Sequence, residues 1–198
     1  MSGMDRRELL RLLAASPFPV LLGASPAALE QAVRVAHASV ADPGRYQARF
    51  FTPAEWETVL LLADLIIPRG ERSGSAGDAM VPEFIDTLLA DGEEVQQTAL
   101  RGGLAWLDRE CRSRWENPFR MLAVSRQTTV LDDIAWPARA LPVLSQGVAF
   151  FTRFRDLVAA GFWSSRIGVD DLGYVGNTFV SQWTGCPASQ LRKLGLPD

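Results

Sequence analysis

The chain has 198 residues, of which 47% are hydrophobic and 22% charged, a size and balance that suit one domain with its own core. Its net charge of -3 argues against nucleic-acid binding, because proteins that hold phosphates usually carry a basic patch. Two cysteines and one histidine exclude a disulfide framework and a Cys/His zinc site of the ordinary type.

The N-terminus has the order of a secretory signal. Arg6 and Arg7 precede paired leucines, and the run from Leu12 to Leu29 is then uncharged. Paired arginines followed by leucines resemble a twin-arginine signal, which directs folded proteins across a membrane. We therefore expect an export signal over residues 1–28 and a single domain over residues 29–198. The alternative is an amphipathic N-terminal helix, because the same leucines would suit one.

A first helix is expected from Pro26 towards Ala41, where Pro43 and Gly44 end it. This helix carries His37, the only histidine of the sequence. A lone histidine among small apolar residues is typical of a structural role.

The clearest local signal lies before the second expected helix. Thr52 can cap this helix, Pro53 suits its first position, and Glu55 completes a capping box. Phe51 can pack on Trp56 across the same turn. The residues that follow are apolar on more than one side, which predicts a buried helix.

Periodicity predicts four further helices separated by helix breakers. A flexible polar loop is expected over residues 69–80, before the first of them. Ser125 is expected to cap the third, and Gly161 is expected to be the C-cap of the fourth. Cys111 falls on the apolar stripe of the second and is expected to be buried. The expected helices run from Pro82 to Gly92, from Glu93 to Trp115, from Ser125 through Ile134, and from Val143 to Ala160.

The segment from Phe150 to Pro187 combines large aromatics with glycines and small polar residues, and no charge occurs between Leu172 and Leu191. It is either an irregular lid over the protein's own core or a docking surface for another protein. Composition alone favours the lid, but the lack of catalytic motifs and the family resemblance set out below favour docking. On that interpretation we expect five side chains to contact a partner: Trp163, Tyr174, Asn177, Trp183 and Cys186.

No convincing strand is found along the chain. The pattern therefore predicts an all-α protein, a single irregular domain of about six to eight helices. An extended C-terminal segment rich in glycine and aromatic residues is expected to follow these helices.

The sequence lacks the motifs of several enzyme classes. It has no G-x-G-x-x-G fingerprint, no C-x-x-C-H haem motif and no phosphate-binding loop. Its two pairs of adjacent aspartates are expected to be solvated rather than catalytic, because neighbouring side chains point apart. The enzymatic alternative that is left pairs Ser164 or Ser165 as nucleophile with His37 as base.

Several spaced blocks together resemble the gluconate 2-dehydrogenase subunit 3 family. The first is FFTPAEWETVLLLADLIIP, followed by VPEFIDTLLAD; a central LDDIA and a closing GFWSSRIGVDDLGYVGNTFVSQWTGCP complete the set. The resemblance covers the chain from Phe50 to Pro187, and the paired arginines at its start also fit.

The resemblance implies an accessory role in an FAD-dependent sugar or polyol dehydrogenase complex. It implies that a large catalytic subunit of the glucose-methanol-choline type holds FAD, that this chain holds no cofactor, and that a cytochrome c or another acceptor takes the electrons. The small subunit would support maturation and stability of the large one and its passage through the twin-arginine export machinery. The expected location is periplasmic, with membrane association through the complex. A stand-alone cytoplasmic helical interaction module is the alternative.

Export would carry Cys186 into an oxidising compartment. It lies between a glycine and a proline, in a turn where a thiol is accessible. We therefore expect Cys186 either to pair with Cys111 or to form a bridge to the partner subunit.

Overall fold

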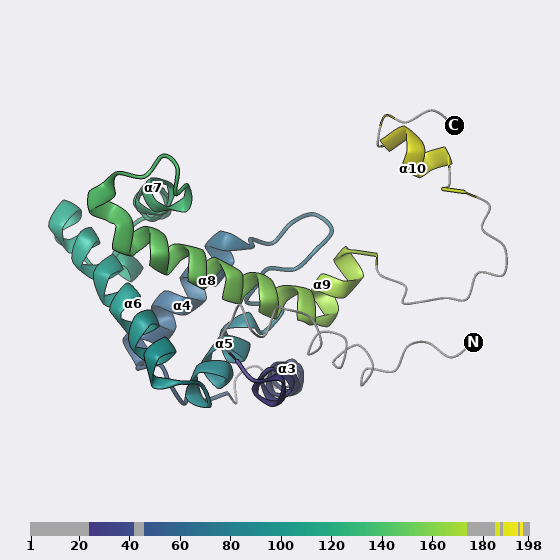
Figure 1. Cartoon of the computed structure of the whole chain (residues 1–198), viewed down its shortest axis with the longest axis horizontal. Helices are drawn as coiled ribbons and strands as arrows, with labels where there is room; N and C mark the ends of the chain where they lie inside the picture. Colours follow the sequence, from purple (N-terminus) through teal and green to yellow (C-terminus); the bar gives the residue numbers. More distant parts are fainter. Residues whose placement is uncertain (1–23, 42–45, 174–184, 187, 194, 196–198) are drawn as a thin grey trace.

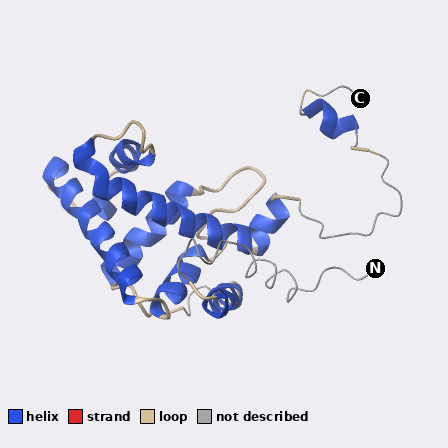
Figure 2. Ribbon diagram, in the orientation of Figure 1, coloured by secondary structure: helices blue, strands red, loops and turns tan. Residues whose placement is uncertain are grey.

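The structure is a computed structural model that describes residues 24–41, 46–173, 185–186, 188–193 and 195. Within these ranges the regular secondary structure is helical throughout and contains no strand (Figure 2). The α-helices are α3 (Pro26–Ser39), α4 (Pro53–Ile66), α5 (Val81–Ala90), α6 (Glu94–Trp115), α7 (Val124–Ala135), α8 (Ser145–Ser164), α9 (Arg166–Asp171) and α10 (Ala188–Lys193). Two short 3₁₀ turns, η2 (Phe119–Met121) and η3 (Pro142–Leu144), precede α7 and α8. The prediction of a single all-α domain is confirmed.

Helix α5 is the innermost element of the fold. Its residues from Val81 to Leu89 are all buried, so the helix has no solvent face, and α3, α4, α6 and α8 pack against it (Figure 1). The long helix α8 also contacts α6, α7 and α9. These two helices therefore connect most of the other elements into one core.

The start of α4 follows the prediction. The Thr52 hydroxyl accepts a hydrogen bond from the Glu55 N–H at 3.4 Å, and the Glu55 carboxylate accepts one from the Thr52 N–H at 2.8 Å. The rings of Phe51 and Trp56 pack with centroids 6.4 Å apart. This capping box satisfies backbone donors at the helix start and sets the direction in which the chain enters α4.

One buried carboxylate holds the segment before α4 onto α5. Asp86 is 0% exposed and accepts hydrogen bonds from the hydroxyl of Tyr46 at 2.7 Å and from the N–H groups of Arg49, Phe50 and Phe51 at 2.7, 3.0 and 2.9 Å. A buried charge is tolerated when donors surround it in this way. Asp86 therefore joins two parts of the chain that lie far apart in sequence.

Glu83 is the second buried acid of α5. The residue is 6% exposed, and its Oε2 atom has no hydrogen-bond partner among the described residues. Burial raises the pKa of this carboxyl above its ordinary value of 4.5, and the nearby charge of Asp86 raises it further. The folded state therefore binds this proton more tightly than the unfolded state. Its contribution to stability is fully present below pH 4.5 and is lost as the pH rises through the higher pKa of the folded state.

We expect E83Q to raise the melting temperature at neutral pH, because glutamine keeps the shape of the side chain and carries no charge. The difference from the wild type should be smallest below pH 4.5 and should grow as the pH rises. Thermal unfolding followed by circular dichroism measures it. E94Q, at an exposed glutamate in the first turn of α6, is the matched control. If the difference in melting temperature between E83Q and the wild type did not change with pH, the raised pKa of Glu83 would be contradicted.

The loop over residues 69–80 is anchored to the fold, so the expectation of a flexible polar loop is wrong. Asp64 on α4 accepts a hydrogen bond from the Gly77 N–H at 2.7 Å, and Asp78 accepts one from the Ser75 N–H at 2.7 Å. Two alanines of this loop are also buried in the core. Its polar composition concealed this order, because aspartate side chains bind the loop backbone itself.

Two predicted helix ends are also wrong. Ser125 lies inside α7, whose N-cap residue is Ala123. Gly161 lies inside α8, which continues to Ser164. A side chain at Gly161 would place its Cβ 2.8 Å from the ring of Phe84. This glycine therefore allows two helices to approach closely, and it does not end one.

Candidate functional site

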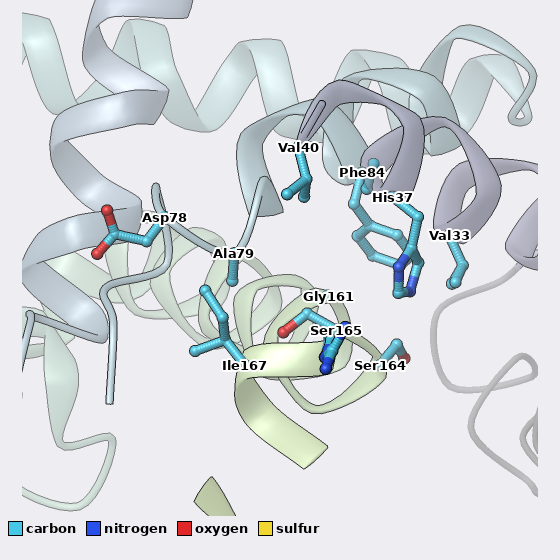
Figure 3. Close-up of a pocket in the computed structure, with 12 residues that line it drawn as sticks. Val33, His37, Val40, Asp78, Ala79, Phe84, Gly161, Ser164, Ser165 and Ile167 are labelled. Atoms are coloured by element: carbon cyan, nitrogen blue, oxygen red, sulfur yellow. The ribbon is translucent and has the colours of Figure 1, made fainter. Parts of the chain in front are cut away.

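A cavity of about 260 Å³ lies between α3, α5 and the junction of α8 with α9 (Figure 3). Most of its lining side chains are apolar, and they come from four separate parts of the chain. The cavity is lined by Val33, Ala36, His37, Val40, Asp78, Ala79, Phe84, Gly161, Ser164, Ser165, Arg166 and Ile167.

The sharp turn between α8 and α9 shapes one wall of the cavity. The Ser165 hydroxyl caps α9 by accepting a hydrogen bond from the Gly168 N–H at 3.0 Å. Gly168 is required at this place, because a Cβ there would collide with the carbonyl oxygen of Phe162. The turn carries Ile167 against the cavity (Figure 3).

Asp78 and His37 both line the cavity but do not form a catalytic pair. Figure 3 shows His37 and Asp78 on opposite sides of the cavity. The Asp78 carboxylate is engaged in its own loop, where it accepts from the Ser75 N–H and pairs with Arg69. A catalytic base is normally oriented by a third group, and Asp78 is not placed to orient His37.

The structure does bring Ser164, Ser165 and His37 to one cavity, as the enzymatic alternative requires. The Ser165 hydroxyl, however, donates to the carbonyl of Phe162 at 2.7 Å and accepts from the Gly168 N–H. Its proton therefore points at a backbone oxygen and not at an imidazole. This geometry argues against Ser165 as the nucleophile, whereas Ser164, the other candidate, lines the cavity together with His37. The enzymatic alternative stays a prediction for Ser164.

The size and lining of the cavity suit an apolar side chain. Sites for small molecules typically measure about 300–1,000 Å³, and this cavity, at about 260 Å³, is smaller. Val40 in its wall is 55% exposed, and Trp163, which precedes the lining residue Ser164 in the sequence, is 40% exposed. Exposed apolar side chains next to an apolar hollow are typical of protein–protein contacts.

Trp163 is the predicted contact residue that the structure describes on a helix. It lies in the last turn of α8, is 40% exposed and packs edge-on against Phe162, with ring centroids 5.0 Å apart. Its contact with a partner stays a prediction. The other aromatic and polar contact residues and the signal arginines lie outside the described residues: Tyr174, Asn177, Trp183, Arg6 and Arg7.

The two cysteines are both free in the structure. Cys186 is exposed, whereas Cys111 is 0% exposed on α6, and burial raises the pKa of its thiol to about 12. The predicted pairing of Cys111 with Cys186 is therefore wrong for this fold, because the Cys111 sulfur lies within the core. A bridge from Cys186 to a partner subunit stays a prediction.

We expect iodoacetamide to alkylate Cys186 and to spare Cys111 in the folded protein at neutral pH, because the thiolate is the reactive form. Mass spectrometry of proteolytic peptides distinguishes the two sites. The C186S variant should remain unlabelled until a denaturant exposes Cys111. Rapid alkylation of Cys111 in the native variant would be incompatible with the burial described above.

The described residues contain no group of three or more His, Cys, Asp or Glu side chains placed to bind a metal ion. None of the described helices combines the length and the hydropathy needed to cross a membrane. The candidate site therefore rests on the cavity and on the exposed apolar side chains beside it.

The family model of gluconate 2-dehydrogenase subunit 3 matches residues 53–182. The chain belongs to this family. The match begins at the first residue of α4 and includes the walls of the cavity that come from α5, α8 and α9. The subunit 3 family is named for a small subunit of a dehydrogenase complex, in agreement with the resemblance in the sequence blocks. No curated protein and no solved structure matches the chain.

The sequence patterns did not reveal the cavity of this subunit 3 chain. They treated His37 as a structural residue or, in the enzymatic alternative, as a base for Ser164 or Ser165, but they did not predict an apolar cavity between α3 and the end of α8. The available signal was the pair of small residues, Ala36 and Gly161, that face the cavity from two helices. The patterns also treated residues 136–143 only as a break between helices, although this segment is exposed and largely apolar.

Proposed function

We propose that this chain is the non-catalytic small subunit of an exported, FAD-dependent sugar dehydrogenase whose catalytic subunit is of the glucose-methanol-choline type. Membership of the subunit 3 family across residues 53–182 is the observation that carries the proposal. The flavin then belongs to the partner subunit, and this chain holds no cofactor. The engagement of Ser165 and Asp78 in local structure supports a role without catalysis.

In this role the chain stabilises the catalytic subunit, supports its maturation and carries it through the twin-arginine machinery. That machinery exports folded proteins, so one signal, marked by Arg6 and Arg7, serves both subunits once they have assembled. The complex works in the periplasm, with membrane association through its other components. A cytochrome c subunit is the proposed electron acceptor.

The cavity and Trp163 form one proposed contact with the catalytic subunit. Tryptophan is enriched among the residues that dominate binding energy, and the cavity receives an apolar side chain of the partner. Tyr174, Asn177, Trp183 and Cys186 extend this contact in the proposal.

Co-expression with the products of the neighbouring genes tests the function. We expect a tagged full-length chain to co-purify a subunit with flavin absorbance and sugar-dependent dye reduction, whereas the chain alone should show neither property. Replacing Arg6 and Arg7 together by lysine should retain the complex in the cytoplasm. Purification without any flavoprotein, or flavin bound to the isolated chain, would rule out the proposed role.

A further inference from the structure

The loop between α7 and α8 exposes an apolar segment, WPARALPV, over residues 136–143. Within it Trp136, Leu141 and Val143 are 61%, 64% and 79% exposed. Single apolar side chains on a surface are ordinary, but contiguous groups of them mark contact sites. We call residues 136–143, together with Asp132, the Trp136 surface.

Two hollows flank Trp136. A hollow of about 540 Å³ lies between α6, α7 and the loop and is lined in part by Leu141 and Val143. A second hollow, of about 290 Å³, lies between α4, α7 and α8 and reaches Phe151. Trp136 and Asp132 line both hollows. A partner could therefore contact these two side chains from both hollows.

Some charged side chains on this surface form ion pairs with described residues, and others do not. Arg114, at the edge of the larger hollow, is held by two acidic neighbours at 2.7 and 2.6 Å. No described residue forms an ion pair with Asp132 or Arg139, both of which are exposed. The Arg139 guanidinium lies 6.0 Å from the centre of the Trp136 ring. The surface thus offers one carboxylate and one guanidinium beside an exposed indole.

The Trp136 surface lies far from the cavity. In Figure 1, α7 and the loop after it are at one end of α8, and α9 is at the other. The surface also lies wholly within residues 53–182, the span of the family match, whereas α3, which forms one wall of the cavity, lies outside it. A partner that binds the part of the chain matched by the family model would therefore find all of this surface within that part.

We infer that the Trp136 surface is a second docking face for the catalytic dehydrogenase subunit. The identity of this partner rests on the proposed function. The complementary patch presents apolar side chains to Trp136, Leu141 and Val143, a cation to Asp132 and a carboxylate to Arg139. Once the partner covers it, the indole of Trp136 supplies most of the affinity, while the two opposite charges fix the orientation of the partner.

The test uses the full chain co-expressed with the flavoprotein subunit. V143D places a charge in the contact and should lower the amount of captured flavoprotein at least about tenfold, and D132R should also weaken capture. Val95, an exposed valine at the start of α6, is 69% exposed, so V95D is the matched control and should capture as much as the wild type. All three variants should melt within a few degrees of the wild type, because each site is exposed.

The outcomes separate the two proposals. Capture by the wild type together with loss in V143D supports the docking face. Equal capture by the wild type, V143D and V95D overturns this inference and leaves the proposed function standing. Failure of the wild type to capture any flavoprotein overturns both. If light scattering shows that the chain alone is a dimer and V143D a monomer, the surface is a contact between copies and the inference is wrong.

Discussion

Replacing Asp86 by alanine is expected to lower the free energy of unfolding by about 4 kcal/mol. The carboxylate accepts from the Tyr46 hydroxyl and from three consecutive backbone N–H groups. Alanine would leave the three backbone N–H groups without this acceptor, and each unsatisfied buried donor costs about 1–3 kcal/mol. For a chain of this length the melting temperature should fall by roughly 10 °C.

Asparagine at position 86 tests the origin of this loss. One oxygen of Asp86 accepts from Phe50 and Phe51 and the other from Tyr46 and Arg49. Asparagine keeps only one of these oxygens, so D86N should cost about half as much as D86A. Burial raises the pKa of the Tyr46 hydroxyl above its ordinary range, so this group remains a donor at every ordinary pH.

The control for D86A is Asp91, just beyond the end of α5. It pairs with Arg49 at 2.9 Å, but both side chains are well exposed. D91N should therefore change stability by less than about 1 kcal/mol. Equilibrium unfolding in urea gives all three values. Similar losses in D86A and D91N would mean that the network around Asp86 does not hold the segment before α4.

The role of Asp86 shows where a single sequence stops being informative. VPEFIDTLLA reads as an amphipathic helix with one polar side, and its acids would ordinarily face water. The structure buries them, because the donors for Asp86 come from Phe51 and its neighbours, which lie 35 or more residues away along the chain. By contrast, Thr52 and Glu55 lie within one turn, and their capping box could be predicted.

Some features of the candidate site could also be predicted from the sequence, and others could not. Trp163 stood out in the sequence because it is a large aromatic in a segment with few charges, and the structure describes it as partly exposed. The cavity needs residues of both α3 and α8, which come together only through tertiary packing. The Trp136 surface was hidden for another reason. Its two prolines were interpreted as helix breakers, and no local rule says whether the apolar residues between them are covered.

The second large effect is expected where α6 crosses α8. Gly147 on α8 lies against the ring of Trp106, and a Cβ at this position would collide with that ring. Trp106 is only 6% exposed and is enclosed by the core, so it has little room to move away. G147A should therefore lower the free energy of unfolding by at least about 2 kcal/mol, as overpacking of a dense interior does.

Gly102 provides the matched control. It is an exposed position on α6 where an added Cβ would meet nothing within 4 Å. G102A should stabilise the protein by about 0.5–1 kcal/mol, because alanine loses less backbone entropy than glycine in a helix. The same substitution thus has opposite signs at two helical glycines. Destabilisation of both variants to the same degree would show that the collision at Gly147 is not the cause.

The crossing is built from one pattern used twice. Gly103 and Trp106 on α6 face Phe150 and Gly147 on α8, so each helix offers a glycine three residues before an aromatic ring. Because the two pairs match in reverse order, the pattern requires antiparallel helices.

The crossing also predicts a specific rescue, in which W106L recovers part of the stability that G147A loses, since the smaller side chain makes room for the new methyl group. F150L should not rescue G147A, because the ring of Phe150 packs against Gly103 and not against Gly147. Double-mutant cycles measure the coupling energy of G147A with W106L and of G147A with F150L. Equal coupling energies would contradict the specific contact between Gly147 and the ring of Trp106.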